Sequence, residues 1–209
     1  MAKEYGHYCG LARALDVVGD RWNLLIVRQL LIAPARYGTL RDGLPGVATN
    51  LLADRLRDLE TAGVIERRLG EAGVPEYALT AWGAELRDPI EGLIRWSGPL
   101  MVRGPQGDHF RAEWLLLALP ALFAHRTPPD RSAMIAVEVP EGSVHLHATP
   151  SGVTLTEPGD HRPEAVIRAE APVILGLAAG MLTLETAEAM IDVSGDIDAL
   201  RTVFAGAPN

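Results

Sequence analysis

The sequence predicts an α+β protein made of two domains joined by a short linker. In residues 1–98, apolar residues recur at the three- and four-residue spacing of helices, and one pair of short β-prone runs lies among them. In residues 110–209, β-prone runs are combined with unusually apolar helical stretches. Residues 99–109 lie between them and hold proline and glycine in a run that cannot continue a helix.

The charge is divided unevenly between the two halves of the chain. Residues 1–103 carry 13 Lys and Arg against 13 Asp and Glu, whereas residues 104–209 carry 6 Arg against 14 Asp and Glu, which is the whole net charge of −8. Such asymmetry suggests two units with different partners. Because the first half is neutral, any contact with nucleic acid depends on where its arginines lie.

The composition favours a cytoplasmic protein without membrane contact. The single cysteine, Cys9, excludes a disulfide within the chain, which is typical of a reducing compartment. The longest apolar run, Trp114 to Ala124, is broken by Pro120 and is too short to span a bilayer. No early segment has the layout of a signal peptide.

The first helices are predicted from their apolar faces and their capping residues. Leu11, Leu15 and Val18 share one helical face, and Gly19 can end that helix. Asp20 is expected to cap the next helix by accepting a backbone N–H. The apolar stripe of this second helix consists of Trp22, Leu25, Ile26 and Leu30.

Two more helices, a hairpin and a last helix should follow. A short helix is expected at 37–43 and a longer one from Thr49, as N-cap, to Ala62. The runs 64–69 and 76–79, around a glycine-containing loop, predict a hairpin. Thr80 should cap one last helix that is kinked at Pro89 and carries Leu86, Ile90, Leu93 and Ile94. Helix, turn, helix and hairpin in this order are typical of a winged helix-turn-helix domain, whose second helix of the pair enters the major groove.

A helical wheel predicts which side chains would meet DNA. At about 100° per residue, Leu52, Leu56 and Leu59 form a core face, and the opposite face holds Asn50, Ala53, Asp54 and Arg57. Asn and Arg can read adenine and guanine edges, whereas arginines on the preceding helix and the hairpin would meet phosphates. Ordinary solvated charges are the alternative. The DNA-binding candidates are Arg36, Arg41, Thr49, Asn50, Asp54, Arg55, Arg57, Arg67 and Arg68.

Residues 7–97 resemble the HxlR family of bacterial regulators. The similar stretches include Tyr8-Cys9, Gly19-Asp20-Arg21-Trp22, Leu59-Glu60 with Ala62-Gly63-Val64-Ile65, and Leu79-Thr80-Ala81-Trp82-Gly83. The resemblance implies a homodimer that is paired through the first and last helices of the domain and binds double-stranded DNA at a pseudo-palindromic operator. One departure is Gly10, because members usually follow the cysteine with proline.

Residues 110–205 are similar to sterol-carrier-protein-type lipid-binding domains. The matching pattern is a first helix at 114–123, strands at 133–139, 143–148, 153–156 and 165–168, and a closing helix, loop, helix and strand between 171 and 196. The resemblance implies a sheet and helices that enclose an apolar cavity for a small hydrophobic ligand. Plain core packing is the alternative for each candidate lining residue; these are Trp114, Leu115, Leu119, Leu122, Phe123, Ile174, Leu177, Met181 and Phe204.

Two further patterns in the sequence could carry chemistry. Some relatives sense oxidants through a cysteine at the place of Cys9, and His7 could lower its pKa. However, a disulfide would need a second subunit, and free cysteines are often buried and inert. His145 and His147 project from one strand face, but a third metal ligand is missing. With no catalytic motif in the chain, we expect no enzyme, no metal and no cofactor.

The sequence therefore favours a transcription regulator, a repressor rather than an activator, that responds to a small hydrophobic ligand in its second domain. One alternative is a thiol-switched regulator that acts through Cys9. The other is a carrier of hydrophobic metabolites whose first domain does not bind DNA.

Overall fold

The computed structural model describes residues 4–70 and 73–204. Its internal contacts divide the chain into two compact units, residues 1–90 and 91–209. This division falls inside the helix Arg87–Trp96, whereas the domain boundary expected from the sequence lies in the linker 99–109. A continuous helix thus crosses the point of division, and the linker 99–109 stays a prediction.

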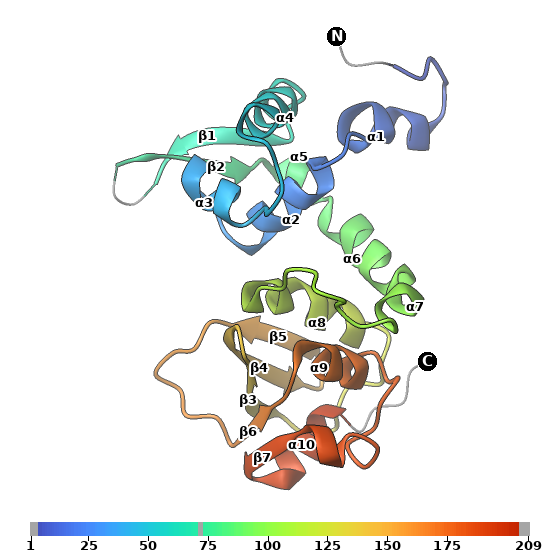
Figure 1. The fold of residues 1–209 in the computed structure, drawn as a ribbon, viewed down its shortest axis with the longest axis vertical. Helices are drawn as coiled ribbons and strands as arrows, with labels where there is room; N and C mark the ends of the chain where they lie inside the picture. The colour runs from blue at the N-terminus through green and yellow to red at the C-terminus, as the bar shows by residue number, and fades with distance from the viewer. Residues whose placement is uncertain (1–3, 71–72, 205–209) are drawn as a thin grey trace. The chain divides into compact units, whose positions relative to one another are not determined.

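The first unit is a winged helix-turn-helix fold (Figure 1). Strands β1 and β2 pair antiparallel, from Ile65 opposite Leu79 to Leu69 opposite Pro75. A single bridge adds Ala35 to this ladder, opposite Tyr77. In chain order the elements are α1 (Gly10–Val18), α2 (Asn23–Ile32), α3 (Tyr37–Asp42), α4 (Thr49–Thr61), β1 (Ile65–Leu69), β2 (Pro75–Leu79), α5 (Ala81–Ala84) and the start of α6 (Arg87–Trp96).

The core of this unit is built from one face of each helix. The side chains of Leu52, Leu56 and Leu59 on α4 are completely buried, as are Ile26 on α2 and Leu40 on α3. The helical wheel for α4 is therefore confirmed. The face predicted for α1 is confirmed only at its end: Val18 is buried, whereas Leu11 is 69% and Leu15 38% exposed.

Both predicted N-caps before α2 and α4 are wrong. Helix α2 begins at Asn23 after Trp22, which adopts a left-handed conformation with φ of 87°. The chain turns there, so Asp20 lies too early to cap α2, and its carboxylate instead pairs with Arg55. Thr49 already has helical geometry, and Ala48 is the N-cap without a side-chain bond.

The expected last helix is divided into α5 and α6. Thr80 caps α5 as predicted, because its Oγ1 accepts the Gly83 N–H at 3.0 Å. The helix cannot continue through Pro89, whose ring would clash with the carbonyl of Glu85 four residues earlier. Helix α6 therefore begins anew at Arg87, where proline falls in a first turn and is tolerated.

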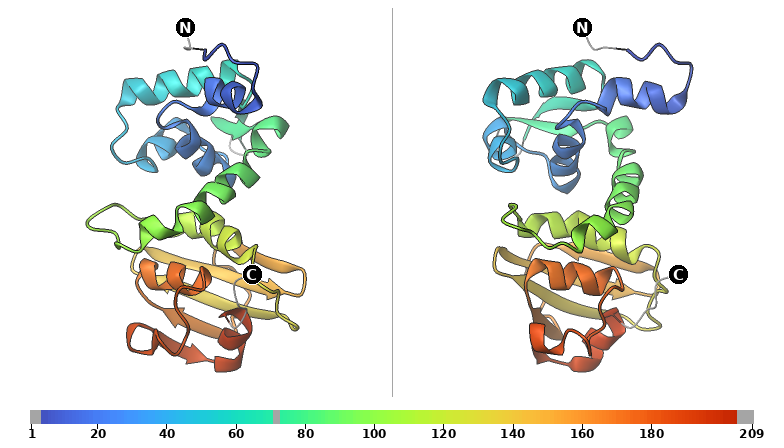
Figure 2. Two further views of the ribbon diagram at one scale, coloured as in Figure 1. Left: turned by 90° about the vertical axis from the view of Figure 1, so that its right-hand side faces the viewer. Right: turned by 45° about the vertical axis from the view of Figure 1, so that its right-hand side comes forward.

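The second unit contains a mixed five-stranded sheet in the order β5-β4-β3-β6-β7. Only β3 and β6 run parallel; the other neighbours are antiparallel. Figure 2 shows this sheet and its helices in two further views. In chain order the elements are α7 (Gly98–Met101), the 3-10 helix η1 (Ala112–Trp114), α8 (Leu115–Phe123), β3 (Ala133–Val139), β4 (Gly142–Thr149), β5 (Gly152–Thr156), β6 (Ala165–Arg168), α9 (Ala171–Ala178), the 3-10 helix η2 (Glu188–Met190), β7 (Asp192–Gly195) and α10 (Ile197–Phe204).

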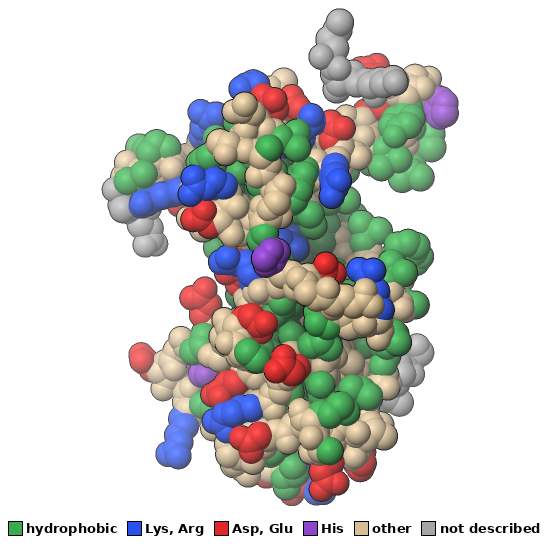
Figure 3. All heavy atoms as spheres, viewed as in Figure 1, with side chains coloured by type: hydrophobic (Ala, Val, Ile, Leu, Met, Phe, Trp, Pro, Cys, Tyr) green, Lys and Arg blue, Asp and Glu red, His purple; other side chains and the backbone are tan. Residues whose placement is uncertain are grey.

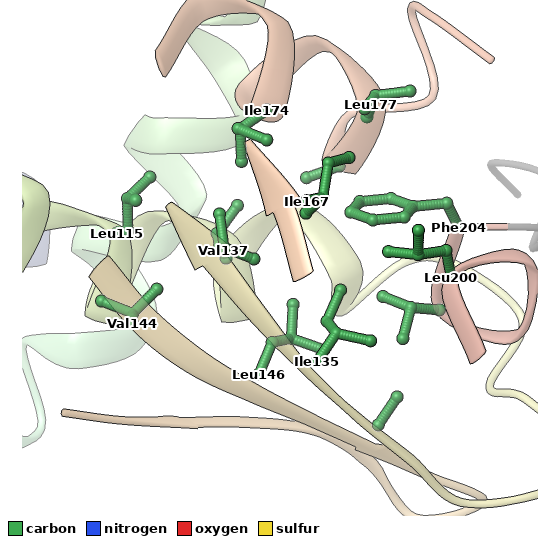
Figure 4. Close-up of a cluster of buried hydrophobic side chains, with 14 of the residues drawn as sticks. Leu115, Ile135, Val137, Val144, Leu146, Ile167, Ile174, Leu177, Leu200 and Phe204 are labelled. Atoms are coloured by element: carbon green, nitrogen blue, oxygen red, sulfur yellow. The ribbon is translucent and has the colours of Figure 1, made fainter. Parts of the chain in front are cut away.

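Alternation along the strands builds the core of this unit. On β4, Val144 and Leu146 are buried, whereas His145 between them is only half-buried. The buried strand residues point toward Leu115 of α8, Ile174 and Leu177 of α9, and Leu200 and Phe204 of α10 (Figure 4). The predicted strands are confirmed to within a residue at each end. The second of the two helices that the resemblance implied between 171 and 196 is not formed as an α-helix, because residues 179–187 hold turns and bends and only the short 3-10 helix η2 follows them.

None of the helices in the described ranges is long and apolar enough to cross a membrane.

Gly83 is predicted to be indispensable for the first unit. A Cβ at this position would lie 1.9 Å from the backbone carbonyl oxygen of Val64, which cannot move without disturbing the start of the hairpin. We expect Gly83→Ala to lower the free energy of unfolding by at least about 1–3 kcal/mol, as for other overpacked sites, in urea titrations. The control is Gly92→Ala in α6, where a Cβ meets only one Arg95 side-chain nitrogen at 3.9 Å. This variant should be neutral or more stable by about 0.5–1 kcal/mol. Equal effects of both variants would contradict the packing described here.

Candidate nucleic-acid interface

Helix α4 presents a polar face to the outside because its leucine face is buried. Asn50, Asp54 and Arg57 are exposed on the side opposite to the leucines, and we call these three residues the outward face. Arg57 is 67% exposed in its side chain. Ala53, which the wheel places on the same side, is half-buried.

The preceding helix is fixed against the start of α4. The Tyr37 hydroxyl on α3 donates to the Thr49 carbonyl at 2.8 Å. Leu40 of α3 and Leu44 of the following turn are buried. Arg36 and Arg41 are both exposed, and Arg41 pairs with its neighbour Asp42 at 3.0 Å.

Most arginines near the outward face are neutralised by an acidic neighbour. Arg57 pairs with Asp54 at 3.0 Å and Arg68 with Glu76 at 3.1 Å. Arg67 pairs with Glu60 at 3.3 Å and also lies 5.2 Å from the centre of the Tyr77 ring. Figure 3 shows blue and red side chains close together on this unit. Exposed pairs contribute about 0–1 kcal/mol, so a phosphate can replace the carboxylate at little cost.

Arg55 differs from the other arginines of the interface. Its side chain is only 20% exposed, and it pairs with both Asp20 and Asp58, the latter at 3.2 Å. Asp20 lies 35 residues earlier, in the turn between α1 and α2. The sequence suggested Arg55 as a DNA contact because it lies on α4; the pairing that sets it apart is not visible in a local pattern.

The candidate ligand-lining residues of the second unit are mostly packed together. Trp114 and Leu122 are half-buried, and Met181 lies at the surface, 51% exposed. The remaining six form part of one continuous apolar core; they are Leu115, Leu119, Phe123, Ile174, Leu177 and Phe204.

A pocket of about 300 Å³ lies beside this core, at the end of α8. Of the predicted lining residues only Phe123 contributes to its wall. The lining consists of Pro120, Phe123, Ala124, Arg126, Thr127, Pro128, Pro129, Ser151, Gly152, Val153 and Val203.

Arg126 forms the polar part of this pocket and was not identified from the sequence. Its guanidinium is buried and donates to the carbonyls of Leu177 and Phe204, at 2.7 Å each, at the ends of α9 and α10. It also lies 5.3 Å from the centre of the Phe123 ring. Burial lowers the pKa of Arg126, although an arginine remains charged. The carbonyl ends of two helices favour a cation here.

Cys9 is the N-cap of α1, and its thiol is exposed. The backbone N–H groups of Ala12 and Leu11 lower the pKa of Cys9, because they stabilise the thiolate. His7, which the sequence suggested for this effect, instead has its ring 6.4 Å from that of Tyr5. Among the described residues, no group of three or more His, Cys, Asp or Glu could hold a metal ion.

Comparison with known proteins identifies the first unit. A family model described as an HxlR-like helix-turn-helix matches residues 17–103. The HTH-type transcriptional regulator YodB of Bacillus subtilis is 33% identical over 86 residues, which are 40% of this chain and 77% of YodB. The chain belongs to the HxlR-like helix-turn-helix family.

Two further proteins are similar to this HxlR-like chain over a stretch of similar length. The HTH-type transcriptional regulator sll1512 of Synechocystis sp. is 41% identical over 86 residues, which are 40% of this chain and 64% of that relative. The chain thus spans less than two thirds of sll1512. A crystal structure of quinone-bound YodB from B. subtilis is similar, with a TM-score of 0.38 and 28% identity over 43% of this chain and 96% of that one.

The lowered pKa of Cys9 predicts a reactive thiol in this HxlR-like chain. Alkylation by iodoacetamide requires the thiolate. Because the folded pKa is lowered, the pH midpoint of the alkylation rate should lie below that of the same protein unfolded in urea. The stability that this thiolate contributes should be present above the unfolded pKa and be lost as the pH falls through the folded pKa. Coincident midpoints for folded and unfolded protein would show that the helix start does not activate Cys9.

Proposed function

We propose that this chain is a transcriptional repressor of the cytoplasm that binds a pseudo-palindromic DNA operator as a homodimer and responds to a small hydrophobic ligand. The observation that carries the DNA-binding part is the outward face of α4, which lies in a helix-turn-helix unit with an arginine-bearing hairpin. Asn50 and Arg57 would meet base edges in the major groove, and Arg67 and Arg68 would meet phosphates. Arg36 before α3, Arg41 in the last turn of α3 and Thr49 at the start of α4 are exposed and would meet the flanking DNA backbone.

Exposed apolar side chains of the first unit support the homodimer. Leu11 is 69% and Trp82 is 55% exposed. Val17 and Trp82 also line a groove of about 630 Å³ beside α1. Apolar surface of this kind is typical of an interaction site. A second copy that packs on α1 and the last helices of the domain would cover it, which explains why the apolar face predicted for α1 is not buried within one chain.

We place the proposed ligand in the pocket beside Phe123 and Arg126. Six of the candidate lining residues pack against one another in the core. The pocket beside them is lined by an aromatic ring, prolines and one cation. Ligand sites are mostly apolar with few polar groups. A sterol-carrier-like role for the second unit is supported by its sheet and apolar helices. The ligand can regulate DNA binding only if its affinities for the DNA-bound and DNA-free forms of the protein differ.

Cys9 supports a second candidate function, a thiol-switched regulator. The thiol is exposed, and its lowered pKa favours the nucleophilic thiolate. Formation of a disulfide would require the Cys9 of a second copy. A Cys9-dependent dimer band on non-reducing gels, with loss of DNA binding after peroxide, would favour this mechanism over the ligand.

DNA binding can be tested by gel shift on the duplex upstream of the protein's own gene. Arg57→Ala should weaken binding by about 1–3 kcal/mol and relax sequence preference. Arg68→Ala should weaken the binding of all duplexes alike. It should also flatten the salt slope, which is the slope of the logarithm of the binding constant against the logarithm of the salt concentration, by about one unit. The control is Arg201→Ala, because Arg201 pairs with Asp198 at 3.0 Å at the same helical spacing as Arg57 with Asp54, but in the second unit. If Arg57→Ala binds like the wild type at every salt concentration, the outward face does not read DNA.

Removal of one acidic partner should strengthen non-specific binding. Glu76→Gln keeps the size of the side chain but frees Arg68 for a phosphate. We expect tighter binding of random-sequence duplexes and a salt slope that is steeper by up to about one unit. Glu138→Gln, which removes one of the two carboxylates that pair with Arg168 in the second unit, serves as control and should change neither value. Weaker binding by Glu76→Gln would contradict the exchange of carboxylate for phosphate.

The ligand pocket can be tested with 8-anilinonaphthalene-1-sulfonate, an apolar anion that fluoresces in protein pockets. Ser151→Trp places a large ring in the pocket from an exposed turn, without altering the core. We expect this variant to lose saturable fluorescence. Glu141→Trp, at the exposed turn between β3 and β4, should retain it. If both variants show the same saturable fluorescence as the wild type, the probe does not bind in this pocket, and the proposed ligand site is wrong.

A further inference from the structure

Arg55 lies on the helix proposed to read DNA, yet its charge is held within the protein. Its side chain is 20% exposed, compared with 67% for Arg57 two residues later. Its guanidinium pairs with Asp20 and with Asp58. Its Nε is buried and has no hydrogen-bond partner among the described residues. One cation and two carboxylates give this cluster a formal charge of −1, which repels a phosphate.

Asp20 belongs to a turn with an unusual backbone. The carbonyl of Asp20 accepts the N–H of Asn23 at 3.1 Å, and Trp22 between them has φ of 87°. A bulky residue in this region is strained and persists only where its surroundings hold it. The Asp20–Arg55 pair is one such restraint.

The same turn also reaches the residues that precede α4. A Cβ placed on Gly46 would lie 3.8 Å from the Trp22 ring, so this ring lies over the turn between α3 and α4. The turn from Asp20 to Trp22 therefore contacts both the segment before α4 and, through Arg55, the middle of α4 itself. Two attachments of this kind fix the direction of a helix better than one.

We infer that Arg55 is a positioning residue, which orients α4 through Asp20 and makes no contact with DNA. This inference rests on the proposed function, because it concerns the helix that is proposed to read the operator. The side chains of Arg57 and Arg68 are 67% and 50% exposed and pair with one carboxylate each, so a phosphate can reach the guanidinium and take the place of that carboxylate. At Arg55 a phosphate would have to displace two carboxylates from a largely buried group, which is far more costly.

The sign of one substitution separates positioning from direct contact. If Arg55 orients α4, Asp20→Asn loosens the helix and should weaken binding of the upstream duplex, by roughly tenfold for a coupled pair. If Arg55 instead contacts a phosphate, Asp20→Asn frees it and should strengthen binding. Asp20 is 62% exposed, so its replacement by an isosteric amide leaves the core intact.

The experiment is a double-mutant cycle on the full chain, measured by gel shift over a series of salt concentrations. We expect Asp20→Asn, Arg55→Met and the double variant to weaken binding of the upstream duplex to a similar extent, because both residues act through one pair. The salt slope should equal that of the wild type, since no phosphate contact is lost. The random-sequence duplex should be bound almost as well as by the wild type.

Other results would overturn the inference. Tighter binding by Asp20→Asn, or a salt slope flattened by about one unit in Arg55→Met, would make Arg55 a phosphate contact while the proposed function stands. If Arg55→Met fails to fold, the sign of the effect of Asp20→Asn still decides. If the wild type shows no preference for the upstream duplex over a random one, the proposed function fails, and this inference with it.

Discussion

The burial of Leu52, Leu56 and Leu59 is the constraint on which the first unit depends. Complete burial of each leucine contributes about 1.5–3 kcal/mol, and all three lie on one side of α4. A rotation of the helix would expose them, so its other side must face outward with Asn50, Asp54 and Arg57. The position of the proposed DNA-reading residues is thus a consequence of core packing.

The sequence predicted those elements that are determined by residues close together in the chain. The hairpin strands β1 and β2 and helices α3 and α4 follow from periodicity and turn residues, and Thr80 marks the start of α5. The strand bounds of the second unit were implied by the resemblance to sterol-carrier-type domains and did not follow from local patterns alone. Features that depend on distant partners were missed. Asp20 pairs with Arg55 across 35 residues instead of capping α2, and Arg126 binds the Phe204 carbonyl across 78 residues. A cap or a loop residue looks the same in sequence whether or not such a partner exists.

The two halves of the chain show why composition alone does not identify a site. Residues 1–103 carry equal numbers of acidic and basic residues. Acidic neighbours such as Asp54 and Glu76 pair with the arginines there, which limits indiscriminate attraction to phosphate. In the second unit, residues such as Leu119 and Ile174 are apolar as a cavity lining requires, but they fill the core. Core and cavity both need apolar side chains, so only the packing distinguishes them.

Cleavage of DNA from a reagent tethered to α4 tests the central claim most directly. In a Cys9→Ser background, the variants Ala53→Cys and Arg201→Cys would each carry a copper–phenanthroline group, the first on the outward side of α4 and the second on the second unit. The account predicts that the group at position 53 cuts the upstream duplex within a major groove, and that the group at position 201 does not cut there. Equal cutting from both positions, or cuts scattered along the duplex, would contradict the claim that α4 reads DNA.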